Sequence, residues 1–200
     1  MAGELLLPLT TGTCEETTPM TANVALYSAV DDELTHYEVN VDDATLLPRN
    51  TVKVPSFVQY AWPHPSRRYL YVATSNRGAG LKADYNHVSA YRIDPQSGAL
   101  TPHGNPQPLR DRAVHVCVDP AARYLLSAHN LPKSGISVNR IESDGSLGAR
   151  VAQPDDALAT GIYPHQVMAK GSTVILVDRG NDAKGNKPED PRSEEHTSEL

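Results

Sequence analysis

The sequence predicts an all-β fold of repeated four-stranded antiparallel sheets, the arrangement of a β-propeller. One phrase of strand, tight turn and strand occurs three times, at residues 58–76, 114–130 and 165–181. Tyr69, Tyr124 and Val174 each open the second strand of the phrase, at intervals of 55 and 50 residues. Because four short strands fit into each interval, this fixed period indicates a repeat architecture.

Short runs of Val, Ile, Leu, Tyr and Thr between turn residues indicate the strands, and no long stretch shows helical periodicity. Residues 1–22 lack the alternation and are expected to be an extended or disordered lead-in. We predict strands at 24–30, 34–40, 46–54, 57–63, 69–75, 87–93, 99–104, 113–118, 124–129, 135–142, 149–153, 165–170 and 173–178. A sandwich would not repeat in this way, so the repeat favours the propeller.

The burial of each strand follows from this architecture. Inner strands are covered on both faces by neighbouring sheets and should be apolar in runs, as they are at 69–73, 114–118 and 173–177. The third strand of each sheet should be half exposed, because it carries the polar residues Ser89, Arg92, Asn139 and Arg140.

Composition limits the environment and the partners. The net charge of −6 argues against a nucleic-acid or anionic-membrane partner. Cys14 and Cys117 are too few for a disulfide framework or a metal-binding pair. The apolar cluster at 5–7 is too short for a signal peptide, and no run reaches membrane-spanning length. These features predict a soluble, cytoplasmic protein.

The predicted ring is incomplete. A propeller closes with four to eight blades, whereas this sequence supplies about three and a half. An uncovered face of about 500 Å² would forgo roughly 12 kcal/mol of apolar burial, so the chain should be marginal or aggregation-prone unless something completes it.

The final nine residues, RSEEHTSEL (192–200), differ in character from the preceding sequence and resemble one reading frame of a common short-read sequencing adapter. We therefore expect 23–191 to be the N-terminal half of a propeller, 192–200 to be non-native, and the genuine protein to continue past Pro191. The alternative is an ordinary acidic tail.

Several phrases resemble the β-propeller lactonase family, which includes 6-phosphogluconolactonases of the propeller type and carboxy-muconate lactonising enzymes. They are HPSRRYLYVATSN, YRIDPQSGALT, VHVCVDPAARYLLSAHN and the block from Tyr163 to Pro191, with its His-Gln and Arg-Gly-Asn-Asp pieces. The resemblance covers residues 24–191 and implies a seven-bladed propeller that opens a sugar or carboxylated lactone. It also implies that this chain, as a fragment, is inactive.

Two histidines are the candidate catalytic residues. Counting back nine residues from each second-strand start places Tyr60, His115 and His165 at equivalent positions of the innermost strand. Innermost strands line the central channel, where propellers bind ligands. An imidazole that titrates near neutrality suits the deprotonation of an attacking water. His165 is the preferred general base or substrate anchor and His115 the second candidate; a structural histidine is the alternative for each.

Charged residues near the same strand ends are candidate substrate ligands. Arg179 and, more weakly, Arg77 could bind a carboxylate or phosphate, and Asp178 and Asp182 lie close by in the sequence. Arg112 is a further weak anion candidate. The alternative for the block after Asp178 is a turn whose polar side chains cap backbone groups.

No zinc-ligand spacing, glycine-rich phosphate loop or nucleophile elbow is found, so we expect no cofactor and no metal. The expected partner is a small lactone. A non-catalytic propeller that binds a protein or small ligand, and a muconate lactonising or cyclase-type enzyme, remain open as alternatives.

Overall fold

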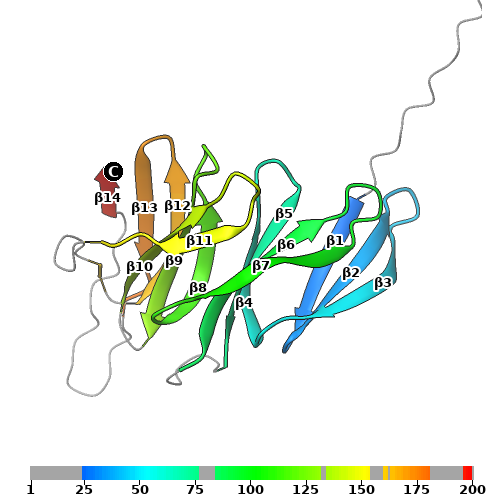
Figure 1. The fold of residues 1–200 in the computed structure, drawn as a ribbon, viewed down its shortest axis with the longest axis horizontal. Helices are drawn as coiled ribbons and strands as arrows, with labels where there is room; N and C mark the ends of the chain where they lie inside the picture. The colour runs from blue at the N-terminus through cyan, green and yellow to red at the C-terminus, as the bar shows by residue number, and fades with distance from the viewer. Residues whose placement is uncertain are drawn as a thin grey trace, which may run out of the picture.

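The computed structural model describes residues 24–76, 84–131, 134–153, 160–161 and 163–180, together with the backbone of 196–199. These residues form four antiparallel sheets that stand side by side in chain order (Figure 1). Within the described ranges, no helix is long and apolar enough to cross a membrane. The secondary-structure elements of the described residues are all β-strands, which confirms the all-β prediction.

Each sheet is built from strands that follow one another in the sequence. The first contains β1 (Val24–Val30), β2 (Glu33–Asn40) and β3 (Thr45–Lys53). The second contains β4 (Phe57–Pro63), β5 (Tyr69–Ser75), β6 (Asn86–Ile93) and β7 (Leu100–Pro108). The third contains β8 (Arg112–Val118), β9 (Tyr124–Leu131), β10 (Gly135–Ile141) and β11 (Leu147–Arg150). The fourth contains β12 (Pro164–Lys170), β13 (Thr173–Asp178) and β14 (His196–Glu199).

The predicted strands are found close to their expected bounds. β1, β4, β5 and β13 have the bounds that the sequence predicted. β7 is longer than predicted, because Gln107 and Pro108 continue the pairing with Val88 and His87 of β6. The backbone of β14 pairs with β13, although 192–200 was expected to be a non-native tail. That expectation stays a prediction.

The β4–β5 and β8–β9 turns share one geometry, which explains why the repeated phrase was visible. Arg67 and Ala122 occupy equivalent places, and both have the left-handed backbone conformation, with φ values of 58° and 56°. Asp119 fixes its turn by accepting hydrogen bonds from the backbone N–H groups of Arg123 and Tyr124, each at 2.6 Å. His64 fills the same position and accepts one from the Ser66 N–H at 3.0 Å. His64 is thus a turn residue.

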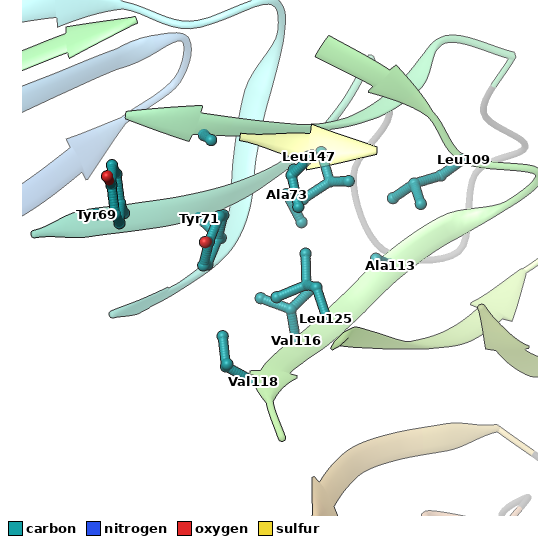
Figure 2. Packing of buried hydrophobic residues seen from close by; sticks show 11 residues of the cluster. Tyr69, Tyr71, Ala73, Leu109, Ala113, Val116, Val118, Leu125 and Leu147 are labelled. Atoms are coloured by element: carbon teal, nitrogen blue, oxygen red, sulfur yellow. The ribbon is translucent and has the colours of Figure 1, made fainter. Parts of the chain in front are cut away.

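Apolar side chains from facing sheets form a separate core at each junction. The cluster between the second and third sheets joins Tyr71 of β5 to Val116 of β8 and Leu125 of β9, and Figure 2 shows these side chains turned toward one another. Similar clusters join the first sheet to the second and the third to the fourth. Burial between sheets therefore holds the row together.

Two expectations about burial need correction. β5 is buried along its whole length, but β13 alternates and leaves Val177 40% exposed. Among the described residues, the buried core of the fourth sheet is shared with the third sheet alone. The third strand is not half exposed throughout. Ser89 of β6 and Asn139 of β10 are buried, whereas Arg92 and Arg140 are exposed. In β10 the more buried and less buried positions alternate along the strand. In β6 both faces are buried from residue 88 to 91, and exposure begins only at Arg92, near the strand end.

Candidate functional site

The innermost strands β4, β8 and β12 are neighbours, because β8 packs against both of the others. Arg112 of β8 contacts Gln59 of β4, and His115 of β8 contacts Tyr60 of β4, so these two strands run in the same direction with matching positions. Residues near the start of each innermost strand therefore gather at one end of the sheets. This end carries the predicted site.

His115 is enclosed by three groups from the adjacent strands. Its side chain is 4% exposed, and its ring centroid lies 4.3 Å from that of Tyr60 and 5.6 Å from that of Trp62. The backbone N–H of Val167 in β12 donates a long hydrogen bond of 3.5 Å to Nδ1. Because Nδ1 accepts, the proton of the neutral ring is assigned to Nε2.

Burial and the nearby His165 together lower the pKa of His115. Burial disfavours the imidazolium, and a second positive charge from His165 would repel it. His115 is therefore a neutral imidazole at pH 7, and its Nε2–H is buried without a hydrogen-bond partner among the described residues. The interaction also shows that the structure brings the two predicted histidines close together.

His165 is exposed and lies in a β-bulge of β12. Pro164 pairs with Asp178 and Gln166 pairs with Val177, so His165 has no partner in the register. The other two innermost strands shift register at the same level: Gln59 and Val114 are likewise skipped, and the residues that follow them, Tyr60 and His115, pair with Ala73 and Ala128. The predicted equivalence holds for Tyr60 and His115 and fails in detail for His165, because the β12–β13 connection at 171–172 is shorter than the turns at 64–68 and 119–123.

Asp178 and Arg179 lie at the same end of the fourth sheet but differ in burial. Asp178 ends β13 opposite Pro164, is 3% exposed, and packs its carboxylate against Gly161. Arg179 is exposed, and its backbone N–H donates to the Tyr163 carbonyl oxygen at 3.0 Å. The other two predicted ligands, Arg77 and Asp182, lie outside the described residues.

The structure adds neighbours that the sequence did not assign to the site. Tyr60 and Trp62 stand on one face of β4 with ring planes 19° apart and centroids 6.5 Å apart. Trp62 packs against the cores on both sides of the third sheet and also contacts His115. The equivalent positions of Tyr60 and His115 in the repeat were the sequence signal for the contact between these rings. Nothing in the sequence indicated the contact between Gln59 and Arg112.

This site lies on a recognisable scaffold. Residues 21–183 match the family described as "Lactonase, 7-bladed beta-propeller", which is most of the chain. The chain belongs to the seven-bladed β-propeller lactonase family.

Relatives of this lactonase-family chain agree with the assignment. A 6-phosphogluconolactonase of Pectobacterium atrosepticum is 36% identical over 105 residues, which cover 52% of this chain and 28% of that protein. A 6-phosphogluconolactonase of an Enterobacter species is 34% identical over 91 residues, covering 46% of this chain and 24% of the relative. The chain thus matches about a quarter of the length of these relatives.

Solved structures share the fold. The periplasmic gluconolactonase of Pseudomonas aeruginosa superimposes with a TM-score of 0.63 at 23% identity, over 77% of this chain and 47% of that one. A putative 6-phosphogluconolactonase of Bacteroides fragilis gives a TM-score of 0.61 at 19% identity, over 80% and 47% of the two chains. At these identities the likeness concerns the fold, and it covers about half of each larger protein.

In this lactonase-family chain, the site combines an exposed imidazole, a buried neutral imidazole and an aromatic wall. An exposed imidazole can exchange protons with water, and a buried N–H can donate to a developing negative charge. Flat aromatic rings offer an apolar surface to a bound ring.

Proposed function

We propose that the protein is a hydrolase that opens a sugar or carboxylated lactone, with His165 as the general base. The observation that carries this proposal is the pairing of two imidazoles from adjacent innermost strands, one exposed and one buried and neutral. Membership of the lactonase family supports the choice of a lactone as the reacting group.

The proposed reaction needs one proton acceptor and one donor. His165 removes a proton from a water molecule while the water oxygen attacks the lactone carbonyl carbon, and the carbonyl oxygen becomes an oxyanion. The Nε2–H of His115 donates to that oxyanion. When the intermediate collapses, the ring C–O bond breaks and the leaving alkoxide takes the proton from His165, which restores the base and releases the hydroxy acid.

Binding of the substrate is assigned to charged residues at the same end of the sheets. We propose that Arg179 contacts the anionic group of the substrate from the solvent side and that Asp178 holds the strand end beside His165. Arg77 and Asp182 remain proposed ligands from the sequence. No cofactor or metal enters the proposed reaction.

The test is lactone opening by the complete seven-bladed protein, measured as acid release at constant pH with 6-phosphogluconolactone and corrected for spontaneous hydrolysis. The His165→Ala variant should lose about 100-fold or more in kcat, the usual contribution of a general base. Arg123→Gln, an exposed substitution in the β8–β9 turn, should leave the rate unchanged. Unchanged turnover in His165→Ala would refute the assignment, and absence of turnover in the unaltered protein would favour a non-catalytic binding propeller.

We also propose that residues 23–191 are the N-terminal half of the propeller and that 192–200 are non-native. On this proposal the 200-residue chain alone is inactive, because a closed ring needs further blades to complete the channel. Sequencing the gene downstream of codon 191 tests it. A reading frame that continues with further repeats is expected, and an independently confirmed stop after codon 200 would contradict the proposal.

A further inference from the structure

Arg112 is held in an unusual way at the start of the innermost strand β8. Its side chain reaches across to β4, where Nε donates a hydrogen bond of 2.6 Å to Oε1 of Gln59. The Gln59 amide is fixed in turn, because Nε2 donates to the Phe57 carbonyl oxygen at 3.1 Å. The guanidinium is therefore aimed by a second side chain.

The charge of Arg112 has no visible counter-ion. Burial lowers the pKa of its guanidinium, which shows that the cation is partly removed from water. Among the described residues, no carboxylate lies within ion-pair distance of Arg112, whereas Arg110 pairs with Asp111 and Arg123 with Asp119. A partly buried cation without an anion is costly, so this position is suited to an anion supplied from outside.

The position and the free donors fit an anionic ligand. Arg112 precedes His115 on the same innermost strand, and the Gln59 that orients it is adjacent to Tyr60 in the aromatic wall. Gln59 occupies Nε and leaves the Nη edge of the guanidinium, which can bind a carboxylate or phosphate through two parallel hydrogen bonds.

We propose that Arg112, oriented by Gln59, anchors the negatively charged group of the substrate and so selects anionic lactones over neutral ones. This inference rests on the proposed function. It assigns Arg112 the main anion contact and leaves exposed Arg179 a peripheral one. Gln59 acts as a positioning residue, because it contacts the ligand only through Arg112.

Binding can be measured on the 200-residue chain without turnover. Trp62 is the single tryptophan of the sequence and lies beside His115, so its fluorescence reports occupancy of the site. The probes are 6-phosphogluconate, gluconate, inorganic phosphate and the neutral methyl glucoside. The unaltered chain should bind 6-phosphogluconate at least about 10-fold more tightly than methyl glucoside, as expected for a charge-assisted contact. The gluconate and phosphate arms distinguish a carboxylate from a phosphate as the group that is held.

Variants separate the anchor from a structural role. Arg112→Gln should weaken binding of 6-phosphogluconate about 10- to 100-fold and leave methyl glucoside unchanged. Arg112→Lys keeps the positive charge but cannot form two parallel hydrogen bonds, so it should lose less affinity for 6-phosphogluconate than Arg112→Gln. It also replaces Arg112→Gln in the test if circular dichroism shows that Arg112→Gln does not fold. Gln59→Ala should weaken anion binding less than Arg112→Gln. Arg123→Gln is the matched control and should bind as the unaltered chain does.

Three results would overturn the inference. The first is that 6-phosphogluconate does not change the fluorescence of the unaltered chain, and the second is that both Arg112 variants still prefer the anionic probes. The third is that Arg179→Gln loses this preference while Arg112→Gln keeps it. A failure of the proposed function can be told apart from a failure of this inference. In that case His165→Ala would turn over lactone as fast as the unaltered protein, while the preference for anionic probes would still depend on Arg112.

Discussion

At the scale of single residues, two buried imidazoles of the third sheet have lowered pKa values in different surroundings. His115 lies between β4 and β12, and its buried Nε2 has no hydrogen-bond partner among the described residues. His129 is fully buried and saturated, with Nδ1 2.9 Å from the Asp111 carbonyl oxygen and Nε2 2.8 Å from Ser137 Oγ. A buried ring nitrogen without a hydrogen-bond partner is typical of a functional histidine, whereas a ring whose two nitrogens both have partners is typical of a structural one.

The pKa of His115 provides a test of the histidine pair. Replacing His165 by Gln removes the repelling charge, so the pKa of His115 should rise, yet stay below that of a free imidazole because burial persists. The measurement is an NMR titration of the His115 ring proton. His103→Gln, in the β7 strand of the second sheet, is the control. If the His115 pKa is the same in the His165→Gln variant, the two rings do not interact.

His129 predicts a loss of stability in acid. Burial lowers its pKa from 6.5 to about 4 in the folded protein. The unfolded chain therefore binds the proton first as the pH falls, and the free energy of unfolding should decrease from about pH 6.5 down to about pH 4, by about 3 kcal/mol in total. Urea denaturation at a series of pH values measures this, with His129→Gln as the comparison. A variant that shows an equally steep decrease would assign the acid sensitivity to other groups.

At the scale of elements, turns that dock on the next sheet hold the repeats together. The β10–β11 turn of the third sheet reaches β5 of the second, where the Tyr71 hydroxyl donates to the Gly145 carbonyl oxygen at 3.0 Å. Gly145 has a φ of 84°, and a Cβ added there would meet the Tyr69 ring. The turn thus depends on glycine for both its backbone conformation and its close contact.

Replacing Gly145 by Ala should therefore destabilise the protein by about 2–4 kcal/mol, from backbone strain and overpacking together. Gly171→Ala is a matched control, because Gly171 also has a positive φ, of 60°, but nothing lies within 4 Å of an added Cβ. Gly171→Ala should lower the free energy of unfolding by only about 1 kcal/mol, because it introduces the backbone strain without the overpacking. Thermal unfolding of both variants measures the difference, and equal losses would mean that the contact with Tyr69 is unimportant.

At the scale of the whole molecule, the row of sheets has two ends that no other described sheet covers (Figure 1). At one end, β1 exposes Val24, Leu26 and Val30; at the other, the fourth sheet exposes Met168 and Val177, which are 42% and 40% exposed. Inner junctions bury such residues completely. The ends therefore present the kind of apolar surface that associates in water.

We expect the 200-residue chain to self-associate through these ends. The double variant Met168→Gln, Val177→Thr should lower the associated fraction in sedimentation velocity at equal protein concentration, because it removes apolar surface from one end. Val41→Thr is the control, because Val41 is also exposed but lies in the β2–β3 connection, outside the fourth sheet that the double variant changes. Association that is equal in all three proteins would place the contact elsewhere.

Much of the fold was predictable because it depends on local sequence. Alternating apolar residues and turn residues such as Asp119 act over a few positions, and their repetition indicated the sheets and the position shared by Tyr60 and His115. The bulge at His165 and the contact between Gln59 and Arg112 were not predictable. The bulge depends on how β12 pairs with β13, and the contact joins residues that meet only when two sheets pack.

The sequence by itself determined the repeated antiparallel sheets and placed His115 and His165 near the start of two innermost strands, because periodicity and turn chemistry depend on neighbouring residues. The tertiary structure alone decided which groups surround those histidines, that His115 is buried and His165 exposed, and that Arg112 lies half-buried with a Gln partner. Burial and charge environment are properties of packed sheets, and they arise only when distant strands come together.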